Sequence, residues 1–583
     1  MVKLLKYLKS YWWQLILLFL LTGVQVFATL QLPALTADII NNGIVTGDIT
    51  HIWQVGIMMM LLAILSAGCA VGSNYISAWV GAGFAKNIRA DIYAKIVNMN
   101  LTDFKRFSTA SLTNRTTNDV NQVQQTMMMM LSMLMRAPLF CVISLVMALS
   151  TAPDMSWIIV LGVSVILGST ILIMSLVIPK YKVFQKMLDQ VTLLTRESLT
   201  GLKVIRAFNN EKLEKQKFEN TNAKLTKLMI KIDKIMKFEN PIINFVFNGA
   251  SLLCTFIGIT LLTKDYAYLG NMSAFSQYVT HVMMSFLMLS MFFVMWPRAN
   301  VSANRINEVL NTPERIHFKK ETLGVPAHTP SVEFRNVDFS YEGAEEKVIE
   351  NVSFVAKAGE TTAFIGSTGS GKSTLINLVP RFYEATAGEI LINGINIRDY
   401  KKEDLMAKIG LVPQRGLLFS GTIKTNIKFG APNATDEQVI EAARIAQATD
   451  FIEKLPNKYN SHIAQGGTNV SGGQKQRLSI ARAICKKPDI YIFDDSFSAL
   501  DMKTDAKLRA ALKPVTAEAV SLVVAQRVST IKDAEQIIVL DSGKVVGKGT
   551  HKELLLRSKV YQGIVKSQLS DKEFEKEMKE AHA

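Results

Sequence analysis

The sequence predicts an α-helical six-span transmembrane bundle with long cytoplasmic helix extensions, followed by an α/β P-loop domain. Three observations predict this fold class: long apolar runs confined to the first half, a change after Pro326 to short strands alternating with amphipathic helices, and a phosphate-loop sequence between one such strand and helix. With 583 residues, 49% of them hydrophobic, the chain has room for two or three folding units. The ordinary numbers of glycine (34) and proline (15) exclude collagen-like and low-complexity classes.

Each predicted span is an apolar run of at least the roughly 20 residues that cross a bilayer. The six runs lie near residues 13–36, 54–80, 130–150, 156–178, 242–263 and 273–296. Lys3, Lys6 and Lys9 before the first run are also typical of a signal peptide, but the run is too long for one and five more follow. Trp12 and Trp13 stand at its start, where amphipathic rings favour the headgroup level.

Basic residues indicate the orientation of the spans. The connections near 81–129 and 179–241 are rich in Lys and Arg. The other connections are poor in both residues: 37–53, 150–155 and 264–272, the last with Lys264 alone. By the positive-inside rule, both long connections, both termini and the second domain are cytoplasmic. Much of the net charge of +16 then lies beside an anionic leaflet, which argues against nucleic-acid binding.

The two basic connections favour helix, with apolar residues at helical spacing and almost no proline. We expect them to continue the spanning helices and to turn back near Leu101–Ser108 and Leu199–Asn209. The predicted domains are a transmembrane domain over 1–312, a linker over 313–330, the nucleotide-binding domain over 331–570 and a charged C-terminal tail over 571–583. Glu and Lys at helical spacing predict that the tail is a solvated helix without an assigned function.

Few polar side chains interrupt the spans. Arg136 lies in the inner part of the third span, where an Arg marks either a functional site or a side chain that snorkels or pairs near the cytoplasmic face. His281 in the sixth span is either a cavity residue or a packing residue. Methionine clusters in the same two spans, and flexible, polarisable Met suits promiscuous binding as well as ordinary packing. The candidate substrate cavity consists of Met133, Arg136, His281, Met284 and Met288.

A phosphate-binding loop connects the predicted strand Thr361–Ile365 to an apolar helix that starts at Leu375. The loop reads GSTGSGKST and fits GxxxxGK[ST] with the correct flanks. Its glycines let backbone N–H groups curl around phosphates, and the helix N-terminus adds its dipole. Lys372 should reach the β- and γ-phosphates, and the Ser373 hydroxyl should ligate Mg²⁺. The candidate nucleotide-binding residues here are Gly366, Ser367, Thr368, Gly369, Ser370, Gly371, Lys372, Ser373 and Thr374.

An acidic pair follows the apolar strand predicted at 490–493. Asp494 ends this strand and Asp495 comes next. A carboxylate at the end of a buried strand beside a phosphate loop is placed to organise Mg²⁺, so Asp494 is a candidate metal ligand.

The residues between these two elements carry a resemblance. Ser471-Gly472-Gly473-Gln474 resembles the signature sequence of ATP-binding-cassette (ABC) proteins. Further residues match the family in order: Tyr341 the aromatic that stacks on adenine, Gln414 the Q-loop glutamine that also reaches the metal, Gln465–Gly467 the exporter-specific loop, Asp501 the D-loop and Gln526 the switch position. The chain as a whole resembles a half-transporter of the bacterial multidrug ABC exporters, specifically the heterodimeric kind.

This resemblance implies ATP and Mg²⁺ as cofactors, a bacterial cytoplasmic membrane as location, and a second half-transporter as partner. In the family, ATP lies between the Walker A loop of one cassette and the signature of the other. Ser471 and the N–H groups of Gly472 and Gly473 would start a helix and close over the γ-phosphate. The two cytoplasmic tips resemble coupling helices.

Two positions depart from the hydrolytic members of the family. Those members carry Glu where this chain has Asp495 and His where it has Gln526. Asp is one methylene shorter, so its carboxylate falls about 1.5 Å short of a water placed for Glu. Gln can hydrogen-bond but cannot titrate as His does. The resemblance therefore implies a degenerate, slow ATP site, and a partner with the intact Glu and His; the alternative is a working homodimer that tolerates Asp.

The predicted function is ATP-driven export of hydrophobic, drug-like or amphipathic compounds as one half of a heterodimer. A lipid or peptide exporter is the alternative within transport. A nucleotide-gated channel or regulator is an alternative of a different class, against which the intact signature argues.

Overall fold

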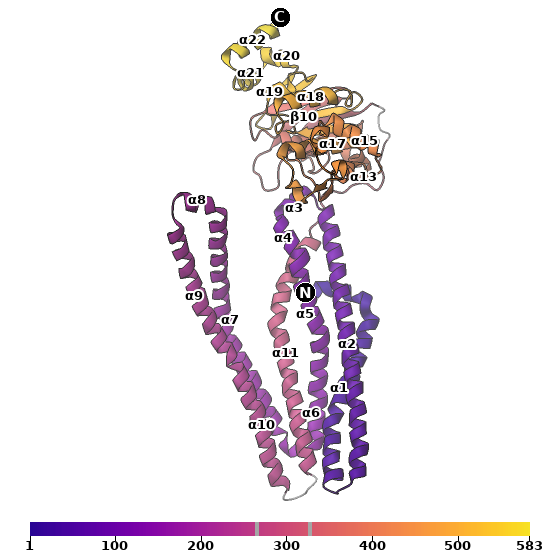
Figure 1. The fold of residues 1–583 in the computed structure, drawn as a ribbon, viewed down its shortest axis with the longest axis vertical. Coiled ribbons are helices and arrows are strands. Elements are labelled where there is room, and N and C mark those ends of the chain that lie inside the picture. The colour runs from indigo at the N-terminus through magenta and orange to yellow at the C-terminus, as the bar shows by residue number, and fades with distance from the viewer. Residues whose placement is uncertain (263–267, 325–328, 583) are drawn as a thin grey trace. The chain divides into compact units, whose positions relative to one another are not determined.

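The computed structural model describes residues 1–262, 268–324 and 329–582. They form two units, one of Met1–Asn98 with Ser108–Thr312 and one of Met99–Phe107 with Pro313–Ala583. The first unit is helical, whereas the second contains sheets covered by helices (Figure 1). The predicted end of the fifth span at 263, the connection with Lys264 and part of the predicted linker lie outside the described residues.

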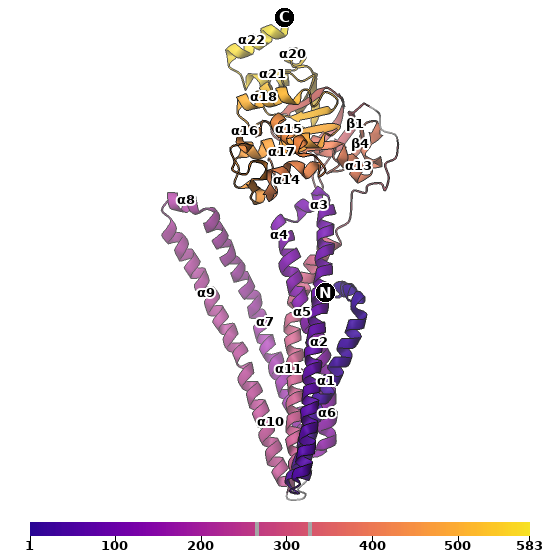
Figure 2. The ribbon, with the colours of Figure 1, turned by 45° about the vertical axis from the view of Figure 1, so that its right-hand side comes forward.

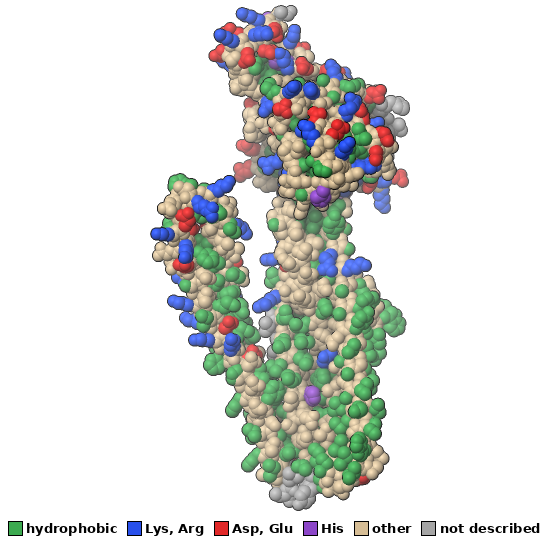
Figure 3. All heavy atoms as spheres, viewed as in Figure 1, with side chains coloured by type: hydrophobic (Ala, Val, Ile, Leu, Met, Phe, Trp, Pro, Cys, Tyr) green, Lys and Arg blue, Asp and Glu red, His purple; other side chains and the backbone are tan. Residues whose placement is uncertain are grey.

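Helices of very different length make up the first unit. In chain order they are η1 (Val2–Tyr11), α1 (Trp12–Asp38), η2 (Ile39–Ile44), α2 (Ile49–Asn98), α4 (Thr109–Asn114), η3 (Arg115–Asp119), α5 (Val120–Met129), η4 (Met130–Leu134), α6 (Met135–Thr151), η5 (Pro153–Met155), α7 (Trp157–Thr200), α8 (Leu202–Ala207), α9 (Glu211–Lys237), α10 (Glu239–Leu262) and α11 (Tyr268–Leu310). Large apolar side chains such as Leu61, Val146 and Phe256 stay exposed. Figure 3 shows hydrophobic side chains spread over the part of this unit that holds α6 and α10. Helices that are apolar all round suit lipid rather than water.

Five helical segments among the described residues are long and apolar enough to cross a membrane. They are Val2–Ile44, Ile49–Asn98, Thr109–Thr151, Pro153–Thr200 and Glu211–Thr260. The sixth predicted span falls in α11, which has 43 residues but includes side chains that the structure does not describe and is not among the five. The helical transmembrane domain is therefore confirmed, and the sixth crossing stays a prediction.

The helices α7 and α9 form a hairpin, with α8 at its tip. Figures 1 and 2 both show this hairpin diverging from the remaining helices of the unit. Helix α7 runs without a break from its apolar first half to Thr200, as expected for a spanning helix that continues into the second basic connection. At the tip, Leu202, Val204 and Phe208 are exposed.

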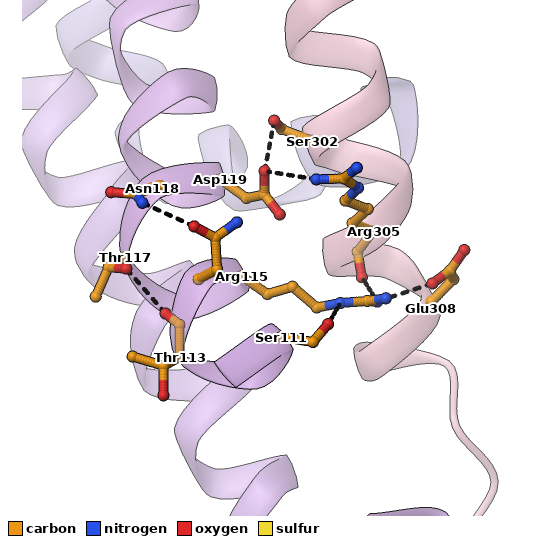
Figure 4. Close-up of polar contacts among 10 residues, drawn as sticks. Ser111, Thr113, Arg115, Thr117, Asn118, Asp119, Ser302, Arg305 and Glu308 are labelled. Atoms are coloured by element: carbon orange, nitrogen blue, oxygen red, sulfur yellow. Dashed lines mark hydrogen bonds and ion pairs between the residues drawn. The ribbon is translucent and has the colours of Figure 1, made fainter. Parts of the chain in front are cut away.

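A polar cluster joins η3 to α11 (Figure 4). The Arg115 guanidinium donates to the Arg305 carbonyl oxygen at 2.5 Å and pairs with Glu308 at 2.8 Å. The Ser302 hydroxyl donates to the buried Asp119 carboxylate at 2.7 Å, and the Arg305 guanidinium lies 4.0 Å from the same oxygen. The π-helical turn η3 thus presents both of its charged residues to α11.

Three sheets form the framework of the second unit. A six-stranded sheet has the order β12-β11-β3-β10-β9-β6, and a four-stranded antiparallel sheet has the order β2-β1-β4-β5; β7 pairs with β8. The strands are β1 (Ser331–Phe339), β2 (Ile349–Lys357), β3 (Thr361–Gly366), β4 (Ala387–Ile392), β5 (Ile395–Asn396), β6 (Ile409–Val412), β7 (Gly421–Thr422), β8 (His462–Ile463), β9 (Ile490–Asp494), β10 (Val520–Val524), β11 (Gln536–Asp541) and β12 (Lys544–Gly549). The central strands β3, β9 and β10 are parallel and almost continuously apolar, because both faces of such a sheet are covered.

Helices flank these sheets. They are α3 (Leu101–Arg106), α12 (Lys372–Leu378), η6 (Ile397–Asp399), α13 (Lys402–Ala407), α14 (Ile423–Ile427), η7 (Lys428–Gly430), α15 (Asp436–Ile445), α16 (Thr449–Ile452), η8 (Lys458–Asn460), η9 (Gln465–Gly467), α17 (Gly472–Lys486), α18 (Met502–Leu512), α19 (Val528–Ile531), α20 (His551–Arg557), α21 (Lys559–Lys566) and α22 (Asp571–His582). Side-chain caps start several of them: Thr435 begins α15, Ser471 begins α17 and Thr550 begins α20, each with a reciprocal capping box.

The short helix α3 belongs to the second unit, although its neighbours in sequence belong to the first. Leu101 packs against the apolar core under the four-stranded sheet. The Lys105 ammonium donates to the Tyr383 hydroxyl at 2.7 Å, and the buried Asp103 carboxylate lies 3.5 Å from Arg315. The first predicted tip is therefore a docked helix of the nucleotide-binding unit.

The charged tail is more than a solvated helix. Phe574 and Met578 of α22 pack against the core of the second unit. Glu577 accepts a hydrogen bond from Lys532 and lies 3.2 Å from His551 Nε2. Burial acts to raise the pKa of Glu577, but these two partners outweigh it and lower the pKa. One face of α22 is thus part of the fold, which the charge pattern alone did not reveal.

Candidate nucleotide-binding site

The phosphate loop lies between β3 and α12, as the sequence predicts. Gly366 and Gly371 have backbone constraints that explain the choice of glycine. A Cβ on Gly366 would lie 2.0 Å from the Leu540 carbonyl oxygen of β11. Gly371 has φ +94°, and a Cβ there would lie 2.8 Å from the Val348 carbonyl oxygen. The tight loop therefore depends on close backbone contacts with two neighbouring segments.

Lys372 bends back over the loop. Its ammonium donates to the carbonyl oxygens of Gly366 at 2.9 Å and Ser367 at 2.7 Å, and to the Ser370 hydroxyl at 3.2 Å. Burial lowers the pKa of Lys372, while the carboxylates of Asp495 and Asp494 act in the opposite direction. The Lys372 ammonium thus lies at the loop where a nucleotide's phosphates would bind. Its N–H groups could donate to phosphate oxygens instead of to the loop.

Ser373 and Asp494 form the pair that fits a metal. The Ser373 hydroxyl donates to Asp494 Oδ1 at 2.8 Å. Burial and the nearby Asp495 raise the pKa of Asp494, partly offset by the Ser373 hydrogen bond and by Lys372. A half-buried carboxylate beside a hydroxyl supplies the hard oxygen ligands that Mg²⁺ prefers. Among the described residues, no cluster of three or more His, Cys, Asp or Glu could hold a metal ion.

Asp495 is bound by amide groups. The Gln526 side chain donates to Asp495 Oδ2 at 2.8 Å, and the Gln414 side chain donates to the same oxygen at 3.3 Å. Asp495 is 7% exposed and adopts φ +47°, a backbone conformation uncommon outside glycine. The two positions that depart from hydrolytic family members therefore contact each other directly.

The aromatic side of the site is built by two tyrosines. The Tyr341 ring meets the Tyr383 ring edge-on at 5.4 Å between centroids, and its hydroxyl lies 2.9 Å from Thr374 Oγ1. Lys105 of α3 holds the Tyr383 hydroxyl. Next to Tyr341, Glu342 pairs with Arg315 at 2.6 Å. Contacts of α3 thus reach both sides of the candidate adenine platform.

A pocket of about 840 Å³ joins these parts. Its lining includes Tyr341, Gln414, Gln526 and the loop residues Gly366, Ser367, Thr368, Gly369, Gly371, Lys372, Ser373 and Thr374. It also includes Val560, Gly563, Ile564, Ser567 and Gln568 in and after α21, which sequence reasoning missed. No motif marks these residues, because they reach the pocket only through the packing of the C-terminal helices. The loop residue Ser370 is buried and does not line the described pocket.

The signature residues are separate from this pocket. Ser471 caps α17, its hydroxyl accepting from the Gln474 N–H at 3.3 Å, and the N–H groups of Gly472 and Gly473 open that helix. None of these residues is among those that line the described pocket. Asp501 caps α18, accepting from the Thr504 N–H at 2.9 Å, which lowers its pKa. Within one chain, the signature therefore takes no part in the described pocket.

The candidate cavity residues are placed by α11 and the segment from η4 into α6. The His281 ring stacks on Phe140 of α6 with 5.4 Å between centroids. Arg136 lies one turn before Phe140, and its buried Nε has no hydrogen-bond partner in the described part of the chain. Met284 is exposed, whereas Met133 and Met288 are half-buried. Phe140 and His281 therefore bring two of the predicted helix faces together.

Sequence profiles match both units. The family model of the ABC transporter transmembrane region matches residues 15–286, and the model described as ABC transporter matches residues 349–498. An uncharacterized ABC transporter ATP-binding protein of Mycobacterium tuberculosis is 36% identical over 559 residues, which cover 95% of each chain. YfiB of Bacillus subtilis, also an uncharacterized ABC transporter ATP-binding protein, is 35% identical over 568 residues, covering 97% of this chain and 98% of that protein.

Two further similarities concern exporters. An ATP-dependent lipid A-core flippase of Syntrophus aciditrophicus is 31% identical over 513 residues, covering 86% of this chain and 83% of the flippase. The solved structure of a bacterial Atm1-family ABC exporter with ATP bound has a TM-score of 0.79 and 23% identity, covering 97% of this chain and 99% of that one. This second similarity shows the fold.

The chain belongs to the ABC transporter family, as an exporter half-transporter in which a transmembrane domain is fused to a nucleotide-binding domain. It is an ATPase-coupled membrane transporter, and its second unit is the ATP-binding domain.

Proposed function

We propose that this chain is the half of a heterodimeric exporter that carries a degenerate ATP site, and that the exporter moves hydrophobic or amphipathic compounds out of the cell. The observation that carries this proposal is the contact between Asp495 and Gln526, 2.8 Å from amide nitrogen to carboxylate oxygen. A general base must be free to reach the attacking water. Here the carboxylate is short, buried and already occupied by two amide donors.

The P-loop residues would bind the phosphates. Lys372 would transfer its hydrogen bonds from loop carbonyl oxygens to phosphate oxygens, which are stronger, charge-assisted acceptors. Tyr341 would stack on the adenine, and Gln414 would lie beside the γ-phosphate. Ser373 and Asp494 would hold Mg²⁺, which supplies positive charge to the phosphate oxygens when bound. Nothing in this set requires Asp495, so the site would bind ATP well and hydrolyse it slowly.

The signature would serve the partner. Ser471, Gly472 and Gly473 do not line the described pocket, and in this proposal they close a second composite site. Their helix N-terminus offers N–H donors and a favourable dipole to a γ-phosphate. A partner with Glu and His at the two altered positions would perform most of the hydrolysis there. Asp501, near the same surface, would belong to the contact between cassettes.

The cargo would bind between α6 and α11. Met133, Met284 and Met288 offer adaptable apolar contacts, and Arg136 and His281 add few polar ones. Bound cargo should protect single cysteines at 133 and 284 from thiol reagents, relative to a cysteine at the exposed position 146 on α6. Equal labelling with and without cargo would contradict the cavity.

Lipid export is the second candidate function. It is favoured by the 31% identity to a lipid A-core flippase over most of both chains. ATPase stimulation of the purified complex by drugs, compared with stimulation by phospholipids and peptides, separates the two candidates.

The membrane arrangement supports a cytoplasmic ATP-binding domain. Basic side chains gather along the hairpin of α7 and α9, where Figure 3 shows them on the face in view. By the positive-inside rule, that hairpin, both termini and the second unit would lie in the cytoplasm, with the bacterial cytoplasmic membrane as the location.

A gain-of-function variant tests the degenerate site. The double variant Asp495→Glu with Gln526→His should raise ATP hydrolysis at this chain's own site, measured in the assembled transporter with the partner's catalytic carboxylate removed, by as much as about a hundredfold, because it restores the reach lost with one methylene. Gln526→His alone is the matched control and should raise it far less. If the unaltered chain already hydrolyses ATP as fast as the double variant, the degenerate-site proposal is wrong.

A further inference from the structure

The segment after α21 contacts the switch loop through one side chain. Gln568 uses both ends of its amide: Nε2 donates to the Gln526 carbonyl oxygen at 2.8 Å, and Oε1 accepts from the Val528 N–H at 2.8 Å. We propose that Gln568 is a positioning residue of the nucleotide site, which holds the switch loop so that the Gln526 side chain stays on Asp495.

Gln568 extends from a rigid base. Tyr561 and Val565 of α21 are completely buried in the core of the second unit. The Tyr561 hydroxyl lies 2.7 Å from His551 Nδ1 of α20, and His551 Nε2 lies 3.2 Å from Glu577 of α22. Because these contacts tie three helices together, the side chain of Gln568 starts from a fixed point.

The switch loop depends on this contact. Gln526 and Arg527 are exposed, and Val528 begins α19, a helix of four residues whose N-cap residue Arg527 makes no side-chain cap. The first N–H of such a helix has no partner within the helix. Gln568 supplies that partner from outside. Without it, the backbone around Gln526 would lose two hydrogen bonds, which would let the amide move away from Asp495.

Movement of Gln526 would affect bound nucleotide, which is where this inference rests on the proposed function. Gln526 and Gln568 both line the pocket. If Gln526 leaves, the buried Asp495 carboxylate keeps only the 3.3 Å hydrogen bond from Gln414. The less compensated negative charge of Asp495 would then act on phosphates bound beside Lys372, whose ammonium it already influences. ATP should therefore leave the site faster, while the P-loop contacts remain.

Two substitutions separate the two hydrogen bonds. Gln568→Met preserves length and removes both, and Gln568→Glu keeps an acceptor for Val528 but turns a charge toward the Gln526 carbonyl oxygen.

Gln562→Met is the matched control, because Gln562 lies on the same α21 and donates to the Leu555 carbonyl oxygen at 2.6 Å without lining the pocket. With the full-length transporter and a fluorescent ATP analogue, both Gln568 variants should release nucleotide about fivefold faster, as expected for losing a hydrogen bond. The control should change release by less than about 1.5-fold.

A double-variant cycle distinguishes positioning from a merely structural role. In a Gln526→Ala background, Gln568→Met should raise the rate of nucleotide release by less than about 1.5-fold, because its effect acts through Gln526. The proposal is overturned if Gln562→Met accelerates release as much as Gln568→Met, if release is unchanged in the Gln568 variants, or if the full effect persists without Gln526. If the unaltered protein binds no analogue at all, the proposed nucleotide site fails and takes this inference with it.

Discussion

Asp495 and Gln526 are the two residues on which the proposed slow ATP site depends. The sequence could predict the phosphate loop, because glycines at this fixed spacing, with Lys372 and Ser373 after them, are typical of phosphate binding and of little else. It could not predict that Asp495 and Gln526 bond to each other, since they lie 31 residues apart and meet only through the register of β9 and β10. Gln568 carried no signal at all, because a glutamine after an amphipathic helix is ordinary in sequence.

Lys372→Ala should weaken ATP binding by about 30- to 100-fold, the cost of losing charge-assisted hydrogen bonds to phosphate. Occupancy by labelled ATP at fixed concentration measures this. Lys486→Ala is the control, because Lys486 is also half-buried and donates to the Ile409 carbonyl oxygen at 2.7 Å, away from the pocket. Unchanged occupancy in Lys372→Ala would contradict the site.

Asp494→Asn should stabilise the nucleotide-free protein at neutral pH. Burial raises the pKa of Asp494, so the stability it contributes is fully present below the ordinary carboxyl pKa and is lost as pH rises through the folded-state pKa. At neutral pH the buried, ionised carboxylate lowers the stability of the folded protein, and the neutral Asn side chain removes this cost. Melting temperatures without nucleotide, measured from pH 4 to pH 8, should converge for the two proteins at the acid end. If the difference in melting temperature widened toward acid pH, the assigned direction of the Asp494 pKa shift would be wrong.

The same carboxylate should set the pH dependence of Mg²⁺ use if it holds the metal as proposed. In the unaltered protein, Mg²⁺-dependent ATP binding should weaken on acidification at a higher pH than for an ordinary Asp, because the proton competes with the metal. Asp494→Asn should lose the Mg²⁺ dependence at every pH. Persistent Mg²⁺ dependence in that variant would place the metal elsewhere.

Short helices were harder to predict than long ones. The spanning helices and their extensions follow from long apolar runs and helical spacing, which need no tertiary information. The turn near Leu101–Ser108 was also predictable, and Asn100 caps α3 by accepting from the Asp103 N–H at 2.7 Å. That α3 docks on the nucleotide-binding unit could not be predicted, because it depends on Tyr383 and Arg315, more than 200 residues away. The packing of the tail helix α22 could not be predicted for the same reason, because it depends on residues distant in the sequence.

Lys105→Met should loosen α3. Removing the hydrogen bond to Tyr383 should speed amide exchange over residues 101–106 by about three- to tenfold, in line with one lost hydrogen bond. Arg106→Met, the adjacent exposed position on the same helix, is the control. Equal exchange in both variants would mean that Lys105 does not hold the helix.

Ser302→Ala should destabilise the first unit by about 1–3 kcal/mol, because it leaves the buried Asp119 carboxylate without its hydroxyl donor. Thermal unfolding in detergent measures the change. Thr280→Ala, which removes an exposed hydroxyl bonded within the same helix α11, should change stability by less than about 0.5 kcal/mol. A larger loss for Thr280→Ala than for Ser302→Ala would contradict the role of the cluster in Figure 4.

At the scale of the whole molecule, hydropathy and one P-loop were enough to predict a helical membrane domain followed by a nucleotide-binding domain. The predicted number of crossings is matched only in part by the described helices, since five qualify and α11 is not among them. The proposed asymmetry is a property of two chains. One sequence can show which half of each composite site it supplies, but the partner's half must be measured.

The most direct test compares two variants of this chain in the assembled transporter. Asp495→Asn should cost less than about twofold in steady-state ATPase rate, because in the proposed function this carboxylate belongs to the slow site. Ser471→Ala should cost on the order of a hundredfold or more, since under the proposed function it removes a γ-phosphate donor from a hydrolytic site completed with the partner, a loss of about 3–4 kcal/mol by analogy with oxyanion holes. If Asp495→Asn abolishes turnover while Ser471→Ala leaves it intact, the two sites are assigned the wrong way round.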